Sequence, residues 1–493
     1  MLKLKRQGGA DVVFMDNRCV IGIDLGTSSA KVLCRYENGE SLRVRESYGE
    51  NTPQGWLGGV KKALKKITRE IEITEGCVCG IGLTGQVGTY IIETGEKTHI
   101  TMWTDNRDGS CLEKLLGKFT TEEFLSEISM PHPNLISYPA PKLLEFNEKY
   151  NNINIRRIYQ PKDFLCGALA GKMATDKYSW RGLANSDSGR YSEKLLGFTG
   201  IDAAKLPPVI GILDACGTII PELANELGLP LNVPVFTGCN DFFAALLGIG
   251  VWDCGDAFDI TGTSEHIGVI SEDINTDKKL VCGGYFNKNA VYGVTSSSGA
   301  ALRWALDMFG GGGGESAEDI GEILRSEPPV FLPYVNGEER APVFDPDARG
   351  VFFGVNDKSN NAGLRYSVLE GVCFSLFNIR ENIDCDIECL TVAGGAAENK
   401  TLNAIKSELF NVPVNISEET EASALGAAMF ASVGAGWHES LYDAARQMSG
   451  RKNIAVPAGK YRNILLQRYE IFKRLYPVLK EDFKRFQKIW RNT

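Results

Sequence analysis

The chain has 493 residues, of which 43% are hydrophobic and 23% charged, and its formal net charge is −9. That length is enough for two domains with well-filled cores, and the composition is ordinary for a globular protein. The acidic balance argues against nucleic acid or an anionic membrane as a partner. The 13 cysteines include no CxxC pair and there are only 4 histidines, so the sequence predicts no zinc site.

Neither a targeting segment nor a membrane anchor is predicted. The apolar stretch at 12–15 is too short for a signal peptide, and no apolar run is long enough to span a bilayer. A dispersed, odd number of cysteines fits a reducing compartment. We therefore expect a soluble, cytoplasmic protein with no membrane partner.

Strands and helices are predicted to alternate along most of the chain, which favours an α/β fold with helices covering the sheets. In chain order we predict a strand at 19–23, a helix at 56–71, strands at 78–83 and 235–236, a helix at 242–250, a strand and turn at 257–264, strands at 290–295 and 390–393, and helical segments at 402–409, 422–436 and 461–490. The last helix is expected to be interrupted near Pro477. The glycines 310–314 predict a flexible surface loop.

Two similar turns follow predicted strands about half a chain apart. Residues 24–28 (DLGTS) follow the apolar run 19–23, and residues 259–264 (DITGTS) follow 256–258. Glycine lets backbone N–H groups approach a ligand closely and the hydroxyls add donors, so such turns suit phosphate oxygens. The pair suggests a nucleotide bound by duplicated halves. With the boundary placed near 250–255, the predicted domains are 1–250 and 251–493.

Asp24 ends the first of these strands, beside a turn of phosphate-binding type. A carboxylate there would repel phosphate unless a cation intervened, so Asp24 predicts a Mg²⁺ site, direct or through water. The alternative is an aspartate that caps the turn. Asp259 has the matching place in the second half, and we expect it to be structural because the metal needs one strong anchor.

Asp241 lies between a predicted strand and the following helix. Phosphoryl transfer to an alcohol needs a carboxylate that takes the hydroxyl proton, while the rest of catalysis is positioning and charge neutralisation. The alternative is that Asp241 only caps the helix beginning at Phe242. Position in the sequence does not separate the two.

Two further segments suit small polar ligands. The paired glycines at 394–395 lie at a strand-to-helix turn, where a ligand could approach the backbone, although an ordinary tight turn would look the same. The loop at 103–107 (WTDNR) offers an aromatic face with Asp105 and Arg107, which fits a polyhydroxylated ligand. Its alternative is a solvated loop held by the Asp–Arg pair. The small residues of 422–436 indicate close helix packing.

The order of these segments resembles the FGGY carbohydrate kinase family, and within it the xylulokinase-like branch. The resemblance covers nearly the whole chain after the first eighteen residues. Each motif alone is loose, but the ordered series is specific. The matching segments are 21–28, 83–86, 103–107, 161–163, 238–241, 261–264, 332–350, 370–371 and 394–395 with Asn399.

The resemblance implies two actin-like (ribonuclease H-like) domains around a central cleft, with the sugar mainly on the N-terminal domain and ATP on the C-terminal one. It implies Asp241 as general base and Asp24 near Mg²⁺. The implied nucleotide-binding residues are Thr27, Ser28, Thr261, Gly262, Thr263, Gly299, Gly394, Gly395 and Asn399. The implied sugar-binding residues are Gln86, Trp103, Asp105, Asn240 and Asp241. Family members are often dimers, so a homodimer is also expected.

The chain departs from the xylulokinase pattern at Val87 and Gly88, where a Met-His-Gly sequence usually follows Gly-Gln. The imidazole contact to the sugar is absent, and Gly88 is expected to open space for another ligand. Asp105 or Arg107 could replace the contact, or the substrate could lack that hydroxyl. We expect an ATP- and Mg²⁺-dependent sugar kinase acting on a pentulose such as xylulose, with D-xylulose itself a poor substrate. The alternatives are another polyol, a heptulose or a sugar acid as substrate, or a non-catalytic nucleotide or sugar sensor.

Overall fold

A computed structural model describes residues 18–71, 76–105, 109–151, 153–310 and 320–491. The chain divides into two units. The first unit comprises Met1–Gly250 and Glu421–Ser449, and the second comprises Val251–Thr420 and Gly450–Thr493. Asn106, Arg107 and most of the 310–314 loop lie outside the described residues.

The main sheet of the first unit has six strands in the order β3-β2-β1-β4-β9-β8. They are β3 (Ser41–Ser47), β2 (Ser29–Tyr36), β1 (Cys19–Leu25), β4 (Val78–Gly85), β9 (Pro234–Asn240) and β8 (Ala215–Thr218). Strands β3, β2 and β1 are antiparallel, β1, β4 and β9 are parallel, and β8 is antiparallel to β9.

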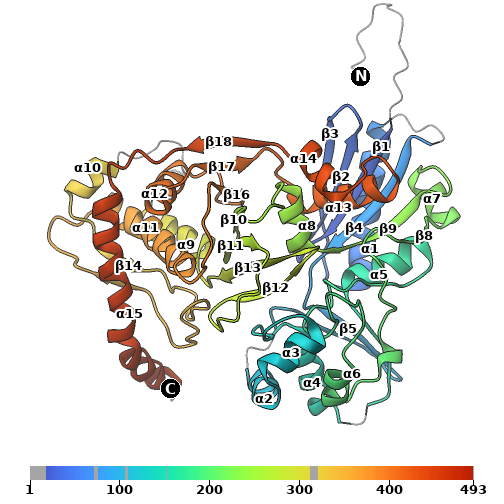
Figure 1. Cartoon of the computed structure of the whole chain (residues 1–493), viewed down its shortest axis with the longest axis horizontal. Helices are drawn as coiled ribbons and strands as arrows, with labels where there is room; N and C mark the ends of the chain where they lie inside the picture. Colours follow the sequence, from blue (N-terminus) through green and yellow to red (C-terminus); the bar gives the residue numbers. More distant parts are fainter. Residues whose placement is uncertain (1–17, 72–75, 106–108, 152, 311–319, 492–493) are drawn as a thin grey trace, which may run out of the picture. The chain divides into compact units, whose positions relative to one another are not determined.

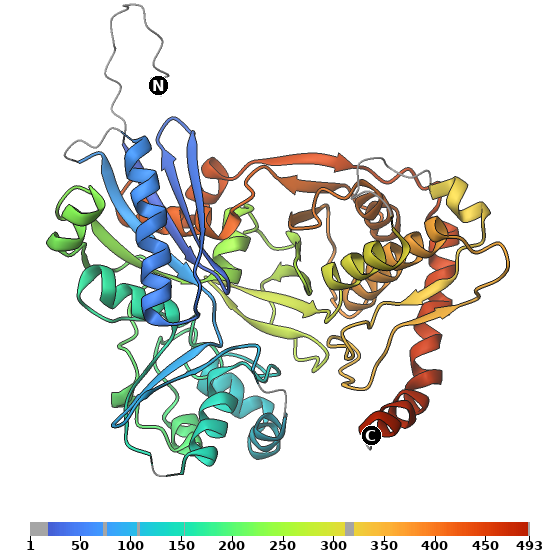
Figure 2. The same ribbon diagram turned by 180° about the vertical axis from the view of Figure 1, so that it is seen from behind.

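Helices cover both faces of this sheet. One face packs against α1 (Pro53–Glu70), α5 (Pro161–Ala170) and α7 (Pro221–Leu227), with α1 in front of the strands in Figure 2. The other face packs against α8 (Asp241–Gly248) and α13 (Ala422–Gly434), which α14 (Leu441–Met448) contacts. Because side chains alternate along a strand, Ile21 and Ile23 of β1 join the core under α1, whereas Gly22 and Asp24 face α13.

A smaller layer completes the first unit. Its sheet has the order β6-β5-β7, with β6 (Thr98–Thr101), β5 (Tyr90–Thr94) and β7 (Ile155–Tyr159). Its helices are α2 (Ser110–Lys118), α3 (Thr121–Ile128), α4 (Pro139–Lys149), α6 (Glu193–Thr199) and the 3₁₀ helix η1 (Ala203–Lys205). The four α-helices share a separate hydrophobic cluster around Trp180 and Leu143.

The second unit is built on a seven-stranded sheet of order β12-β13-β11-β10-β16-β17-β18. The strands are β12 (Val281–Tyr285), β13 (Lys288–Val294), β11 (Glu265–Ser271), β10 (Ala257–Thr261), β16 (Leu390–Gly394), β17 (Val414–Ser417) and β18 (Arg451–Ala455). The helices are α9 (Gly299–Phe309), α10 (Ile320–Arg325), α11 (Asn361–Arg380), α12 (Lys400–Phe410) and α15 (Arg462–Arg491), and a small sheet pairs β14 (Val330–Leu332) with β15 (Val351–Phe353).

The two main sheets repeat one arrangement. In β13-β11-β10-β16-β17, as in β3-β2-β1-β4-β9, three antiparallel strands are followed by two parallel ones. The turn 24–28 connects β1 to β2, and the turn 261–264 connects β10 to β11. The two predicted phosphate turns therefore occupy the same topological position, as the predicted duplication requires.

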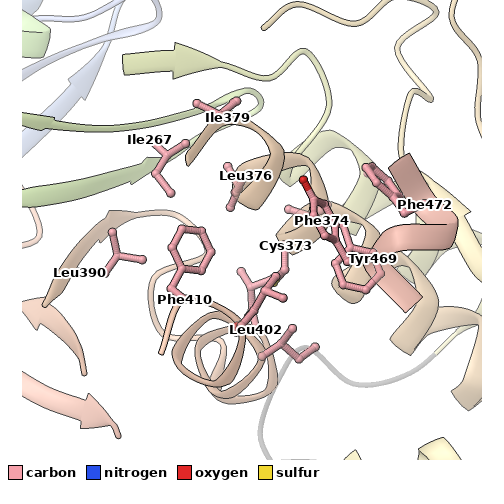
Figure 3. Packing of buried hydrophobic residues seen from close by; sticks show 14 of the residues in the cluster. Ile267, Cys373, Phe374, Leu376, Ile379, Leu390, Leu402, Phe410, Tyr469 and Phe472 are labelled. Carbon is pink, nitrogen blue, oxygen red and sulfur yellow. The ribbon is translucent and has the colours of Figure 1, made fainter. Parts of the chain in front are cut away.

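The core of the second unit surrounds α11. Its side chains lie between strands, α12 and α15, and Phe374 meets the ring of Tyr469 at 5.5 Å between centroids (Figure 3). The helix α15 continues through Pro477, so the predicted interruption is wrong. Beyond the proline, Phe483 is 6% exposed and stacks on Tyr476, and this packing compensates for the lost backbone hydrogen bond.

No helix in the described part of the chain combines the length and apolar character that a bilayer crossing needs.

The expected division at residue 250 would place the segment 421–449 in the second unit, but this segment belongs to the first unit. Figure 1 shows α13, in red, against the blue strands β1 and β4. The contact is between backbones. A Cβ on Gly22 would lie 1.9 Å from the carbonyl oxygen of Ala424, and one on Gly82 would lie 1.8 Å from that of Ala427. The close packing predicted from the small residues of this helix is confirmed.

We predict that Gly82→Ala destabilises the protein by about 3 kcal/mol or more, because the new methyl group overlaps a backbone atom that no rotamer change can move. Gly58→Ala is the matched control. Gly58 lies inside α1 with open space around its Cβ position, so alanine should stabilise by up to about 1 kcal/mol. Urea unfolding of both variants measures the difference. Equal stabilities would show that α13 packs less closely than described.

Candidate active site

Asp24 is held by two elements that flank the end of β1. It is 1% exposed, and its register partner on β2 is Lys31, whose Nζ donates to Oδ2 at 2.8 Å. The hydroxyl of Ser423, from α13, donates to the same oxygen at 2.5 Å. Both donors are side chains of other elements, so capping of its own turn does not describe Asp24. Among the described residues, its buried Oδ1 has no hydrogen-bond partner.

Asp241 is the first residue of α8, but it does not provide the cap. The N-cap is Asn240, whose Oδ1 accepts the Phe243 N–H at 2.8 Å and whose Nδ2 donates to the Tyr178 carbonyl at 3.1 Å. The alternative role for Asp241 is therefore taken by its neighbour. Burial, and then the charge of Asp24, raise the pKa of Asp241 to about 6, while Lys31 opposes the rise.

Lys31 is a site residue that the sequence analysis missed. Its pKa is raised chiefly by the carboxylate of Asp24, with smaller contributions from Glu421 and Asp241. It therefore places a cation among three carboxylates. A lysine seven residues after Asp24, across a short β-turn, was a usable signal. Ser423 had none, because it lies 399 residues from its partner.

The predicted sugar-side residues divide into buried and exposed groups. Gln86 is 2% exposed, and its amide donates to the Gly26 carbonyl at 3.3 Å. Trp103 is 40% exposed, and its indole N–H donates to the Thr27 hydroxyl at 3.1 Å, which ties the segment at Trp103 to the turn 24–28. Asp105 is exposed and accepts the Met102 N–H at 2.8 Å. The predicted pairing of Asp105 with Arg107 falls outside the described residues.

The expectation that Gly88 opens space is wrong. Gly88 is buried with φ +80°, and a Cβ there would lie 3.0 Å from Ser137 and 3.1 Å from the Cβ of Trp103. Those two residues therefore fill the volume. The Gly88 N–H donates to Oε1 of Gln160 at 3.0 Å, so the loop is fixed by its backbone.

In the second unit, the predicted nucleotide-side residues meet at one edge of the sheet. Thr261 and Gly394 are parallel register partners on β10 and β16. The carbonyl of Thr261 accepts the Gly395 N–H at 3.1 Å, and its hydroxyl accepts the Ala396 N–H at 2.9 Å. Gly394 has φ +98°, and a Cβ there would lie 2.0 Å from the Thr261 carbonyl oxygen, so only glycine fits. Asn399 caps α12 through the Leu402 N–H at 2.8 Å.

The turn 261–264 is fastened to the start of α9 through its carbonyl groups. The Gly262 carbonyl accepts the Gly299 N–H at 3.0 Å, and the Thr263 carbonyl accepts the Ser298 N–H at 3.1 Å. In a trans peptide the carbonyl and the next N–H point in opposite directions. The N–H groups of Thr263 and Ser264 are therefore directed away from α9. Gly262 and Thr263 are exposed and Ser264 is half-buried, so this side of the turn is accessible to an anionic ligand.

The protein supplies only part of the ligands that a metal ion would need here. Among the described residues, no group of three or more His, Cys, Asp or Glu side chains is arranged around a common point. Asp24 Oδ1 is one buried acceptor without a partner. Mg²⁺ is commonly bound through one or two carboxylates together with waters and substrate phosphates, so Asp24 fits such an ion and a complete protein cage does not.

Family models match both halves of the chain. The FGGY family of carbohydrate kinases matches with its N-terminal domain over residues 19–248 and with its C-terminal domain over 258–435. A xylulose kinase of Lactococcus lactis is 27% identical over 93% of this chain and 96% of its own, and a gluconokinase of Bacillus subtilis is 26% identical over 90% and 94%. The crystal structure of a ligand-bound xylulose kinase from Lactobacillus acidophilus has a TM-score of 0.84 at 20% identity, with 95% of this chain and 100% of that one covered.

The site geometry predicts opposite stability effects at two adjacent residues. Asn240→Ala should lower the free energy of unfolding by about 0.5–2 kcal/mol, because it removes the cap of α8. Asp241→Asn should raise it at about pH 8, by up to about 3 kcal/mol. The reason is that the folded pKa of Asp241 is above its ordinary value of 3.8, so the ionised group opposes folding at high pH.

The effect of Asp241→Asn on the free energy of unfolding should depend on pH. As the pH falls below about 6, the native carboxylate takes up a proton and its unfavourable contribution declines, until it is lost below the ordinary pKa of 3.8. The difference between Asp241→Asn and wild type should therefore shrink below that pH, whereas the Asn240→Ala difference should remain. Denaturant unfolding at several pH values measures both. A loss of stability in Asp241→Asn at high pH would return the capping role to Asp241.

Proposed function

The chain belongs to the FGGY family of carbohydrate kinases and is a sugar kinase, and from this premise we propose that Asp241 is its general base. The hydroxyl oxygen of the sugar attacks the γ-phosphorus of ATP, the bond to the ADP oxygen breaks, and the hydroxyl proton passes to the Asp241 carboxylate. The single observation that carries this assignment is the division of roles at the start of α8. Asn240 supplies the cap, so the carboxylate beside it is left to act as a base.

The acidity of Asp241 suits this role. A general base works best with a pKa near the operating pH, and burial together with Asp24 brings the pKa of Asp241 to about 6. Lys31 keeps the value from rising further. The neighbouring carboxylate and the cation thus leave Asp241 ionised at neutral pH while keeping it basic.

The phosphates of ATP are proposed to bind the turn N–H groups that face away from α9 and to lie against the exposed glycines at 394–395. The residues proposed for the nucleotide are Thr27, Ser28, Thr261, Gly262, Thr263, Gly299, Gly394, Gly395 and Asn399. Asp24 Oδ1 would hold Mg²⁺, directly or through water, and the ion would neutralise phosphate charge. Thr27 accepts from Trp103, so its hydroxyl proton remains available to a phosphate oxygen.

A pentulose such as xylulose is the substrate class we propose, because the xylulose kinases among the relatives match along nearly the whole chain. The gluconokinase relative makes a sugar acid the alternative. Gln86, Trp103, Asp105 and Asn240 would face the sugar. Val87 and Gly88 offer no side-chain donor, and a buried hydroxyl left without a partner costs about 1–3 kcal/mol, roughly 5–150-fold in affinity.

We predict that Asp241→Asn lowers kcat by about 10²–10⁴-fold, because the amide cannot take the proton, while the affinity for the sugar changes little. Glu222→Gln is the matched control, since Glu222 also lies in the first turn of a helix of the first unit but is exposed. Its turnover should equal that of wild type. Steady-state kinetics and sugar titration separate the two quantities. Near-normal turnover of Asp241→Asn would remove it as the base.

We predict that D-xylulose is a weaker substrate than another ketose or polyol, because of the missing donor at Val87 and Gly88. An ADP-release assay comparing kcat/KM for D-xylulose, L-xylulose, the ribuloses, tetritols and gluconate tests the order. If D-xylulose were best by about tenfold or more, the loop difference would be a neutral replacement. A preference for gluconate would instead establish the sugar-acid alternative.

A further inference from the structure

Each unit buries a lysine between two carboxylates that the proposed reaction does not use. In the first unit this is Lys162, at the start of α5. Its Nζ lies 3.0 Å from Oδ2 of Asp176 and 3.5 Å from Oδ1 of Asp163, and all three side chains are at most 1% exposed. Removing three charges from water costs free energy that their attraction does not reliably return. Such a triad therefore calls for an explanation other than stability.

The first triad fixes a stretch of backbone. Oδ1 of Asp176 accepts the N–H groups of Tyr178 and Ser179 at 2.8 and 2.9 Å. The carbonyls of these two residues then accept the side-chain amides of Asn240 at 3.1 Å and of Gln160 at 2.7 Å. The Ser179 N–H and the Tyr178 carbonyl belong to one rigid peptide unit, through which Asp176 orients Asn240. The same bond fixes the residue whose carbonyl holds Gln160.

Both amide side chains also contact segments that carry proposed sugar-binding residues. Gln160 accepts the Gly88 N–H at 3.0 Å, which fixes residues 86–88, the proposed sugar loop. Asn240 caps the helix that begins with Asp241. Asp163 supports the same network, because its Oδ2 accepts the backbone N–H of Gln160 at 2.9 Å. The chain of contacts from Lys162 therefore reaches the sugar loop and the base, and stays within the first unit.

The second unit has a corresponding triad beneath the phosphate turn. Lys406, on α12, is 0% exposed, and its Nζ contacts Oδ2 of Asp259 and, at 2.7 Å, Oε1 of Glu265. Asp259 lies on β10 and Glu265 begins β11, so the two carboxylates belong to the strands on either side of the turn 261–264. The structural role expected for Asp259 takes this form.

Glu265 also connects the turn to α9. Its Oε2 accepts the hydroxyl of Ser298, which is the N-cap residue of α9 but makes no side-chain cap bond within that helix. The Ser298 N–H donates to the Thr263 carbonyl at 3.1 Å. The hydroxyl is thus used to hold the helix start in place, and the helix start holds the turn carbonyls that direct the N–H groups outward.

We propose that the two buried triads are separate positioning devices. The triad of Lys162, Asp163 and Asp176 sets the sugar loop and the start of α8, and the triad of Lys406, Asp259 and Glu265 sets the phosphate turn. Which ligand each device serves rests on the proposed function, whereas the order it imposes on its own turn does not. If a triad only stabilised its unit, its disruption would change the KM for the sugar and the KM for ATP to the same extent.

The test compares Lys162→Met and Lys406→Met in the full-length protein. Lys162→Met should raise the KM for the sugar about tenfold or more and leave the KM for ATP within about twofold. Lys406→Met should do the reverse. Backbone hydrogen exchange should become faster at 86–88 and 240–243 in the first variant, and at 262–264 and 298–300 in the second. Asp176→Asn and Glu265→Gln keep size and an acceptor oxygen, and they repeat the comparison if a lysine variant fails to fold.

Glu370→Gln is the control. Glu370 is 0% exposed and paired with Arg468 at 2.7 Å, outside both networks, so it should lower stability and leave both KM values unchanged. Equal rises in both KM values for a triad variant, or unchanged exchange at its own turn, would overturn the proposal. If no sugar were phosphorylated by the wild type, the exchange data would still decide the positioning role, and the proposed function alone would fail.

Discussion

The first unit depends on the direct approach of one helix backbone to two strands and another helix. Gly22 and Gly82 let α13 lie against β1 and β4, and a Cβ on Gly426 would lie 1.9 Å from the Ala244 carbonyl of α8. This packing brings Ser423 to Asp24 and sets the position of α8, whose first residue is Asp241. Interiors this dense transmit small displacements. The glycines therefore determine the geometry of the carboxylates although none of them carries chemistry.

The same strand-turn-strand arrangement occurs in both units, but the charged side chains lie in different places relative to the turn. In the first unit, Asp24 and Lys31 lie at the turn itself, and Asp24 contributes to the raised pKa of Asp241. In the second unit the turn is neutral and offers backbone N–H groups, while its charges are buried beneath it in Asp259, Glu265 and Lys406. A carboxylate near a phosphate needs a cation, whereas backbone donors do not. In the proposed mechanism the first turn therefore holds the metal and binds phosphate through the hydroxyls of Thr27 and Ser28, whereas the second turn binds phosphate through its backbone N–H groups.

Much of the fold could be predicted because the signals were local. Short continuous apolar runs gave the strands, a period of about 3.6 residues gave the helices, and glycine-containing turns marked their ends. The α/β class, the duplication of the two turns and the family followed from these segments and their sequence order. Candidate residues at 261–263, 299 and 394–395 do meet at one edge of the second sheet, because strand ends in parallel register share an edge. Whether they bind ATP is still a prediction.

What the sequence by itself determined was the position of some of the strands, turns and helices, and that their order is that of a sugar kinase family. Only the tertiary structure decided that 421–449 belongs to the first unit, that Asn240 rather than Asp241 caps α8, that Ser137 and Trp103 fill the volume beside Gly88, and that Lys406 pairs with Asp259. Each of these is a choice between residues of similar chemistry, and it is settled by neighbours far away in the chain. Ser423 and Asp24 are 399 residues apart, and no local pattern encodes a contact of that kind.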